Sequence, residues 1–434
     1  MRATAAPRWI APADAYAALK DAPGALLMQG GGGAAGRYSF LTAFPEFTVR
    51  SDDPSDGFAA LRARFRPGGT DGDEGFVSGY AGLLSYDLAA AFERVPHRPP
   101  GLCAWPAVSM GWYAASLRFD HAQETIEARG DPAASARLLD AINAPARAEA
   151  GAGDLAMVWD EARYLDAARR AIAYVRAGDV FQVNLSHAFR GRIDGPDAPA
   201  ALIARLAEAS PAAFSAVVQI DADRAVVTNS PERFVRLSSD GVVETRPIKG
   251  TAPRGPDPAS DRAAAEALSV SAKDRAENLM IVDLMRNDLA RVCAAGSVRA
   301  PKLFDVESYA NVHHLVSTVT GRLAPGRGVF DLLAASFPPG SITGAPKPRA
   351  MEIIAELEGE ARGPYCGALG WIGANGAADF NVMIRTAAMR RSGAGWDVEV
   401  RSGGAITIDS DPAEELAETR AKASALARAI RGGA

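Results

Sequence analysis

The order of apolar and polar residues divides the chain into a first part of short strands and a second part with clearer helices and strands. Residues 1–145 contain short strand-like segments between turns, with helical patterns near 13–20 and 133–142. A helix is predicted from Asp160, a residue suited to the N-cap position, to about Ala177. The apolar positions that recur at helical spacing within it are Leu165, Ala168, Ile172 and Val175.

The predicted strands after residue 177 come in runs. They are 180–189, 214–220, 225–228, 233–237, 242–246, 298–309, 312–322, 365–372, 378–390 and 396–401. The predicted helices are 200–208, one long helix over 261–292, 329–336, 348–358 and 412–428. Because the strands follow one another instead of alternating with helices, the pattern predicts an α+β fold with antiparallel sheets, not a doubly wound parallel sheet.

One segment between the two parts has the composition of a linker. Residues 143–156 read NAPARAEAGAGDLA, which is rich in Ala, Gly and Pro and has no periodic apolar positions. We therefore predict an N-terminal region over 1–145 and a second domain over 155–434.

The composition restricts where the protein works and what it binds. The chain has 434 residues, with 47 basic and 52 acidic side chains and a formal net charge of −5. Such a charge gives no general attraction to nucleic acid or to an anionic membrane. No apolar run approaches the ~18 residues of a membrane span, and we recognise no signal peptide. Three widely spaced cysteines argue against a disulfide framework, so we expect a cytoplasmic protein.

Two acidic pairs in predicted helices are candidates for metal binding. Asp274 and Glu277 are three residues apart, as are Glu415 and Glu418, so each pair shares one helix face. Two such faces can hold a divalent cation such as Mg²⁺, which prefers carboxylate and water ligands. Acidic pairs at this spacing are also common on solvated helix faces, so the spacing leaves both interpretations open.

Two residues beside predicted strands have side chains suited to catalysis. Lys249 lies in the segment PIKGT (247–251), and a lysine that is near a cation or removed from water has a lowered pKa and can act as a nucleophile. Glu232 follows Ser230 and Pro231 at the start of a strand, and in a dry site it can keep its proton and act as a general acid. Composition alone favours an exposed position for each.

Further residues in predicted strands are suited to contact an anionic ligand. His313 and His314 point to opposite faces of one strand, so we expect one of them to face inward, as a satisfied core residue or in a site. Arg385 interrupts an apolar strand, and a buried arginine needs an anionic partner such as a ligand carboxylate. The small residues around Gly403 leave backbone amides open to close approach by an anion.

Four long motifs in the second part resemble those of the chorismate-utilising enzymes. They are SPERF at 230–234, ENLMIVDLMRNDLARV at 277–292, FPPGSITGAPKPRAM at 337–351 and DSDPAEELAETRAKA at 409–423. GRYSFL at 36–41 and GYAGLLSYD at 79–87 resemble the N-terminal part of the same family. The family includes anthranilate, aminodeoxychorismate, isochorismate and salicylate synthases. The resemblance implies the anthranilate synthase component I fold, in which two large antiparallel sheets pack face to face with helices outside, and a catalytic domain over 155–434.

The resemblance assigns the acidic pairs to a magnesium site. Glu277 and Glu418 are similar to direct Mg²⁺ ligands, whereas Asp274 and Glu415 are similar to residues that contact the waters of the metal. The family typically has Glu at the position of Asp274, and the shorter side chain fits a water-mediated contact. The metal is expected to bind the ring carboxylate of chorismate.

The resemblance also places residues around the rest of the substrate. Glu232 matches the general acid that protonates the departing C4 hydroxyl, and His314 matches a histidine near that hydroxyl. The matches to residues that bind the enolpyruvyl carboxylate are Arg385, Tyr365 and the amides near Gly403. Other positions expected to line the site are Thr343, Lys347 and Lys422, the last close to the metal carboxylates.

Two positions separate the branches of the family. Gln182 stands where enzymes that add water to chorismate carry a lysine base, and an amide accepts no proton near neutral pH, so isochorismate and salicylate synthesis are disfavoured. Lys249 stands where anthranilate synthases typically carry alanine, and it matches the PIKGT of aminodeoxychorismate synthases. In that branch the lysine attacks C2 of the ring, ammonia then enters at C4, and 4-amino-4-deoxychorismate is made for folate biosynthesis.

The resemblance implies a partner and leaves two competing functions. No cysteine lies in a Gly-x-Cys-x-Gly segment, so a separate glutamine amidotransferase subunit is expected to supply ammonia. The nearest alternative is an anthranilate synthase component I. An alternative of another class is a non-catalytic chorismate-binding regulatory subunit, against which the presence of a nucleophile, an acid and both acidic pairs argues.

Overall fold

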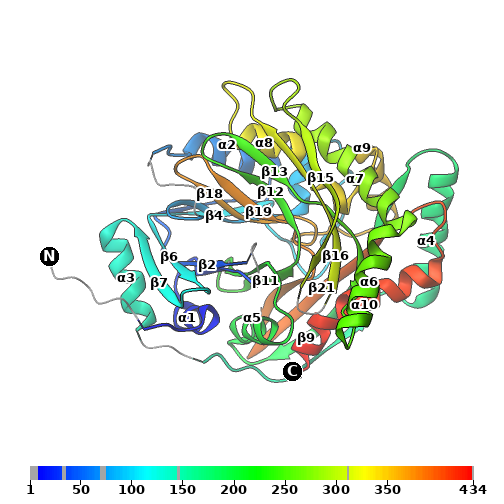
Figure 1. Ribbon diagram of the computed structural model, residues 1–434. Helices are drawn as coiled ribbons and strands as arrows, with labels where there is room; N and C mark the ends of the chain where they lie inside the picture. The colour runs from blue at the N-terminus through cyan, green and yellow to red at the C-terminus, as the bar shows by residue number, and fades with distance from the viewer. Residues whose placement is uncertain (1–7, 32–35, 69–74, 144–146, 310–311, 433–434) are drawn as a thin grey trace.

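Two large β-sheets form the centre of the molecule (Figure 1). The computed structural model describes all residues except 1–7, 32–35, 69–74, 144–146, 310–311 and 433–434. All strand pairs in both sheets are antiparallel, which confirms the predicted α+β class.

The first sheet has eleven strands within the described residues. Their order is β17 (Gly344–Ala345), β9 (Gln182–Asp194), β21 (Gly395–Ile406), β20 (Thr386–Ser392), β11 (Arg224–Ser230), β10 (Phe214–Gln219), β1 (Leu26–Gln29), β2 (Tyr38–Thr42), β6 (Ala115–Asp120) and β7 (Thr125–Gly130), with β8 (Gly153–Met157) beside β9. Strand β21 continues past the end of β20, whose last pair is Ala387 with Val400, so residues 401–406 pair with β9 and not with β20.

The second sheet has ten strands within the same residues. Their order is β14 (Ile248–Pro253), β16 (Val312–Arg322), β13 (Val242–Thr245), β12 (Arg233–Leu237), β19 (Ala378–Asn381), β18 (Ala368–Gly373), β4 (Gly79–Leu84), β5 (Val108–Tyr113) and β3 (Phe47–Ser51), with β15 (Arg299–Ser308) beside β16.

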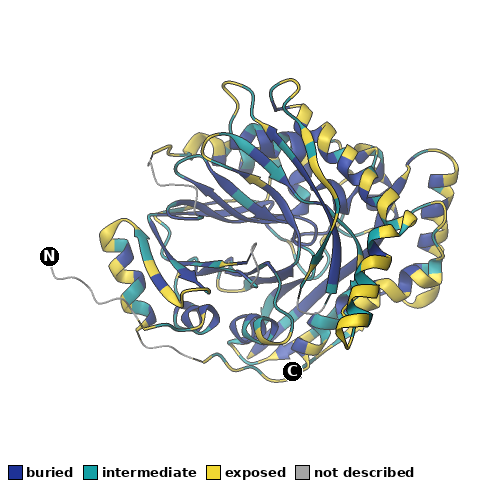
Figure 2. Ribbon diagram, in the orientation of Figure 1, coloured by how far each residue is buried: buried dark blue, intermediate teal, exposed yellow. Residues whose placement is uncertain are grey.

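Helices cover the outer faces of both sheets, and their outward sides are exposed (Figure 2). The outer face of the first sheet packs on α1 (Pro12–Leu19), α3 (Pro132–Ile142), α4 (Glu161–Arg176), α5 (Ala198–Ala209), α9 (Lys347–Glu358) and α10 (Pro412–Ile430). The second sheet packs on α2 (Pro54–Arg64), α7 (Ala272–Ala290), α8 (Val329–Ser336) and the short helices η1 (Tyr86–Ala91) and η2 (Gly340–Ile342), and α6 (Pro258–Val270) precedes α7.

A separate apolar cluster lies between the sheets. It combines residues of both, such as Val218 and Val226 from the first sheet and Leu83 and Leu369 from the second. Burial of this cluster holds the two sheets face to face, because removal of apolar surface from water is the main favourable contribution to folding. No helix within the described ranges is long and apolar enough to cross a membrane.

The chain passes between the two sheets at two neighbouring points. β11 in the first sheet leads into β12 in the second through Pro231 and Glu232, and β19 in the second leads into β20 in the first through residues 382–385. The amide of Val382 donates to the carbonyl of Glu232 at 3.0 Å, and the amide of Asn229 donates to the carbonyl of Arg385 at 2.9 Å. These bonds hold the connections side by side, so Glu232 and Arg385 both lie between the sheets.

Most predicted elements are present, and three differ. The helix predicted over 261–292 is two helices, α6 and α7, because Ser271 leaves the helical conformation and its side chain caps α7 by accepting from the amide of Asp274. The strand predicted over 378–390 is interrupted where the chain changes sheets, and Arg385 there has φ +53°. The predicted linker over 143–156, of which 144–146 lie outside the described residues, ends inside strand β8.

Both sheets take strands from each side of the predicted boundary. Strands β1, β2, β6 and β7 join the first sheet, and β3, β4 and β5 join the second. The division into regions 1–145 and 155–434 stays a prediction. The two regions share both sheets.

Candidate active site

Eleven of the fourteen predicted site residues line one cavity of about 770 Å³. Strands of both sheets and the helices α7 and α10 contribute to its wall. The predicted residues in the wall are Glu232, Lys249, Asp274, Glu277, His314, Tyr365, Arg385, Gly403, Glu415, Glu418 and Lys422. A cavity of this size with converging polar groups is typical of a small-molecule site.

Lys249 lies on β14 at the side of the cavity next to α7. Burial lowers the pKa of its amine, and the nearby positive charge of Lys422 lowers it further. The next residue, Gly250, has φ +84°, and a Cβ there would lie 3.0 Å from the side chain of Asp274. A glycine is therefore required for β14 to approach α7 this closely, and this approach brings Lys249 beside the acidic face of α7.

Glu232 is buried at the first connection between the sheets. Burial raises the pKa of its carboxyl group to about 7, although a hydrogen bond with Ser341 and the charge of Lys249 act in the opposite direction. A carboxyl group with this pKa holds its proton in a large fraction of molecules at neutral pH. Glu232 is therefore suited to donate a proton to a leaving group.

The two adjacent histidines are both buried, but only His314 lines the cavity. His314 Nδ1 lies 2.9 Å from Thr251 Oγ1, and burial lowers the pKa of His314 to about 4, helped by the charge of Arg385. His314 is therefore neutral at physiological pH. His313 faces the other way, with its Nε2 2.9 Å from Asp261 Oδ1.

Arg385 lies at the second connection between the sheets, with a left-handed backbone conformation that is uncommon for a residue with a side chain. Burial lowers the pKa of its guanidinium. No ion pair of Arg385 occurs among the described residues. A buried guanidinium without a carboxylate partner, beside Tyr365 in the same wall, is a suitable group to bind a carboxylate of a ligand.

The four acidic residues reach the cavity from two helices. Burial raises the pKa of Glu277 on α7 and of Glu415 on α10. Burial also acts to raise the pKa of Glu418, but the ammonium of Lys422, whose Nζ lies 2.5 Å from Glu418 Oε1, lowers it overall. Lys422 Nζ also donates to the carbonyl of Gly403 at 3.1 Å, which connects α10 to β21.

The acidic residues fit a magnesium ion that keeps some of its waters. Glu415 Oε2 is buried without a hydrogen-bond partner, and a Cβ at Gly404 would lie 2.7 Å from it and 3.6 Å from Glu418 Oε1. In the described part of the chain, no three His, Cys, Asp or Glu side chains are close enough to form a complete metal site. Mg²⁺ commonly takes one or two protein carboxylates and completes its shell with water and substrate oxygens, so the unpartnered oxygen of Glu415 beside Glu418 fits such an ion.

Three predicted residues are not in the cavity wall. Lys347 Nζ lies 2.6 Å from Asp288 Oδ2 and donates to the carbonyl of Ser336, so it forms a buried ion pair behind the loop. Thr343 Oγ1 donates within its own loop, to the carbonyl of Gly340 at 3.2 Å. Gln182 is fully buried at the start of β9, and neither amide atom has a partner among the described residues. Contact of these three with substrate remains a prediction.

Sequence reasoning missed other polar residues in the wall, among them Asn184, Ser341 and Arg401. Arg401 lies two residues before Gly403, so the alternation of side chains along β21 gave a signal for it, whereas Asn184 lies two residues after Gln182, which is not itself in the wall. Ser341 lies in η2, a helix of three residues, which is too short to give a periodic pattern in the sequence.

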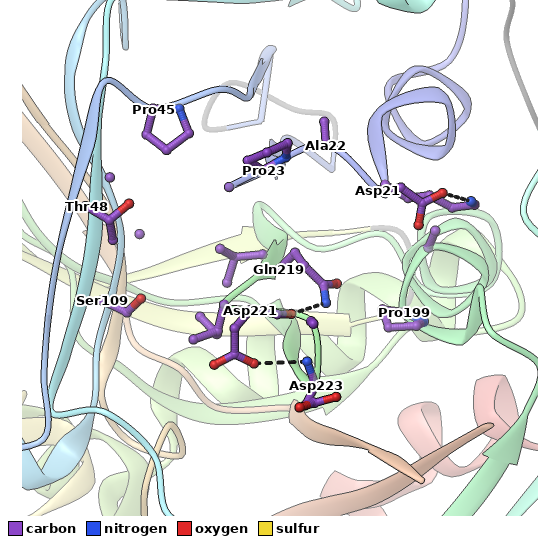
Figure 3. Close-up of a pocket in the computed structure, with 18 of the residues that line it drawn as sticks. Asp21, Ala22, Pro23, Pro45, Thr48, Ser109, Pro199, Gln219, Asp221 and Asp223 are labelled. Atoms are coloured by element: carbon purple, nitrogen blue, oxygen red, sulfur yellow. Dashed lines mark hydrogen bonds and ion pairs between the residues drawn. The ribbon is translucent and has the colours of Figure 1, made fainter. Parts of the chain in front are cut away.

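A second cavity, of about 620 Å³, contains none of the predicted site residues. Figure 3 shows Thr48 and Ser109 on one wall and Gln219 and Asp221 on another. Its charged groups largely pair with one another or with adjacent side chains: Lys20 with Asp21 and Asp197, and Asp221 with Arg50 and Arg224. The first cavity is therefore the better candidate for catalysis.

Comparisons with known proteins show similarity to chorismate-converting enzymes over most of the chain. The aminodeoxychorismate synthase component 1 of Salmonella typhimurium is 41% identical over 382 residues, which cover 86% of this chain and 81% of that protein. The corresponding protein of Escherichia coli is 39% identical, with 88% and 84% covered. The anthranilate synthase component 1 of Streptomyces coelicolor is also 39% identical, with 82% and 73% covered.

The fold is similar to that of a solved anthranilate synthase component I. The crystal structure of anthranilate synthase component I from Streptococcus pneumoniae superposes with a TM-score of 0.79 at 28% identity, over 92% of this chain and 93% of that one. The predicted anthranilate synthase component I-like fold is thereby confirmed. The family model for chorismate binding enzymes matches residues 36–428, so the chain belongs to the chorismate-binding enzyme family.

Proposed function

We propose that this protein is an aminodeoxychorismate synthase component 1, which converts chorismate and ammonia to 4-amino-4-deoxychorismate for folate biosynthesis. The observation that carries the proposal is the position of Lys249, which lines the same cavity as Glu232, Glu277 and Glu418 and has a lowered pKa. Curated proteins of this name are about 40% identical over most of the chain.

The proposed reaction begins with the neutral amine of Lys249. Its nitrogen bonds to C2 of the ring, the double bond shifts, and the C4–O bond breaks as Glu232 transfers its proton to the leaving hydroxyl, which departs as water. Ammonia then bonds to C4, the double bond shifts back, and the bond from C2 to Lys249 breaks with its electron pair going to the lysine nitrogen. The new C4 ammonium gives one proton back to Glu232, which restores the acid. The enolpyruvyl ether is retained throughout, and neutral His314 contacts the C4 hydroxyl.

Two sets of residues in the cavity wall are proposed to hold the two substrate carboxylates. Arg385, Tyr365 and the backbone near Gly403 bind the enolpyruvyl carboxylate. Glu277 and Glu418 would hold Mg²⁺ directly, and Asp274 and Glu415 would contact its waters. The ion, when bound, neutralises the ring carboxylate and so offsets its repulsion by the surrounding carboxylates.

We also propose that ammonia comes from a separate glutamine amidotransferase. The name "component 1" of the relatives implies a second component. The three cysteines support this division, because Cys293 and Cys366 are buried and none lies in a nucleophile segment.

The product identifies the function. The purified protein is incubated with chorismate, Mg²⁺ and ammonium, and the products are identified by mass spectrometry. We expect 4-amino-4-deoxychorismate, and Lys249→Ala is expected to lose its formation. The matched control is Lys302→Ala, because Lys302 is exposed on β15 outside the cavity.

The main alternative is anthranilate synthase, which is favoured by curated anthranilate synthases of similar identity. Anthranilate and free pyruvate as products would establish that function and refute the proposal. Full turnover by Lys249→Ala would refute the covalent mechanism even with the expected product.

A further inference from the structure

Three buried polar atoms without hydrogen-bond partners lie around the acidic face of α10. They are Tyr164 Oη on α4, His187 Nδ1 on β9 and Glu415 Oε2 on α10. Tyr164 and His187 are fully buried, and Glu415 is 7% exposed. Buried polar groups in folded proteins are nearly always paired, so three such atoms in one region need an explanation.

Contacts between the three elements place these three side chains in one region of the structure. The ring centroids of Tyr164 and His187 are 5.0 Å apart, and the rings are arranged edge to face. His187 Nε2 lies 2.8 Å from the hydroxyl of Thr419, one turn beyond Glu415 on α10. Glu415 Oε2 lies over Gly404, which pairs with Leu185, and Leu185 shares its face of β9 with His187.

The hydrogen-bond roles of the three atoms can be assigned. The hydroxyl of Thr419 donates to the carbonyl of Leu416, so it accepts from His187 Nε2, and the remaining Nδ1 of the neutral ring is an acceptor. Burial and the charges of Glu415 and Glu418 raise the pKa of Tyr164, which therefore keeps its proton and is a donor. Glu415 Oε2 is an acceptor.

One donor and two acceptors match a single water molecule. A water can accept from Tyr164 Oη and donate to both His187 Nδ1 and Glu415 Oε2, which gives the three hydrogen bonds that buried waters commonly make. Glu415 Oε1 already accepts from Ser410 Oγ at 2.7 Å. Such a water would leave both oxygens of Glu415 held, and the carboxylate would then have one orientation.

We propose that Tyr164 and His187 are positioning residues that hold the Glu415 carboxylate through one buried water and so orient the acidic face of α10 for a divalent cation. The inference rests on the magnesium site of the proposed function, and it adds two residues that neither the motifs nor the cavity wall contain. Residues that orient direct metal ligands commonly change metal affinity by about 10–100-fold when replaced, and because Glu415 reaches the ion through water we expect an effect at the lower end of this range.

The test measures metal binding without turnover. Mn²⁺, which accepts the same carboxylate and water ligands as Mg²⁺, is titrated into the protein, and the free ion is measured by electron paramagnetic resonance. Tyr164→Phe removes only the hydroxyl, and we expect its Kd for Mn²⁺ to rise about tenfold or more. We expect a similar rise for His187→Phe. The matched control is Tyr80→Phe, because Tyr80 is also fully buried with an unpartnered hydroxyl but packs in the core of the second sheet.

Two results would overturn the inference. One is a Kd of Tyr164→Phe equal to that of the wild type and of Tyr80→Phe. The other is a wild-type protein that binds no Mn²⁺. Thermal unfolding of each variant separates loss of positioning from loss of folding, since a positioning residue changes Kd in a protein that still unfolds cooperatively. Product analysis is independent, so a wild type that made anthranilate would refute the proposed function and leave this inference standing.

Discussion

The raised pKa of Glu232 leads to a quantitative prediction about how the reaction rate depends on pH. With a pKa of about 7, Glu232 is about nine-tenths protonated at pH 6 and about one-tenth protonated at pH 8. Only the protonated form can act as the acid. The pKa of Glu232 is raised above the ordinary value of a carboxyl group. The protonated, active form is therefore present below a pH of about 7 and is lost as the pH rises through that value. The contribution of Glu232 to the rate therefore falls about tenfold over these two pH units.

Lys249 acts in the opposite direction, because only its neutral form is a nucleophile. The observed kcat/KM is proportional to the product of the two fractions. Deprotonation of Lys249 raises kcat/KM with pH, and deprotonation of Glu232 lowers it. Whatever the pKa of Lys249, the slope of log kcat/KM against pH decreases by one near pH 7.

The assay measures kcat/KM for chorismate between pH 5.5 and 9.5, with free ammonia held constant at every pH. Glu232→Gln provides the comparison, because glutamine keeps the size of the side chain without a proton to donate. We expect it to lower kcat/KM by about 10²–10⁴-fold and to remove the change of slope near pH 7. A wild-type profile without a break near pH 7, or the same break in Glu232→Gln, would show that Glu232 is not the acid.

Three further predictions concern other groups. Arg385→Met removes hydrogen bonds to a charged ligand group, each worth about 1.5–3 kcal/mol, so KM for chorismate is expected to rise about 10–100-fold in steady-state assays; an unchanged KM would place the enolpyruvyl carboxylate elsewhere. Glu277→Gln or Glu418→Gln is expected to abolish Mg²⁺-dependent turnover, and activity that persists in EDTA would contradict a role for the metal. Glu358→Ala leaves the buried Arg362 without its carboxylate partner at 2.7 Å, so denaturant unfolding should show a loss of about 3–5 kcal/mol; a loss below about 1 kcal/mol would contradict it.

The positions of Glu232 and Arg385 show why the active site lies where it does. Each residue occupies a connection between the two sheets, and the two connections are hydrogen-bonded to each other. The interruption at 382–385 breaks the regular strand pattern that the sequence predicts over 378–390. A residue with a side chain at φ +53° adopts a conformation that local preference disfavours, and neighbouring strands stabilise it.

The sequence by itself determined the local elements and the types of reactive group. Asp160 caps α4 as predicted, and strand 312–322 and helix 329–336 have the predicted bounds, because caps and apolar periodicity act over a few residues. The tertiary structure alone decided that Lys347 pairs with Asp288 instead of lining the cavity, and that His187 contacts Thr419 on α10. These contacts join residues far apart in the chain, and they depend on how the sheets and helices pack, which no local pattern contains.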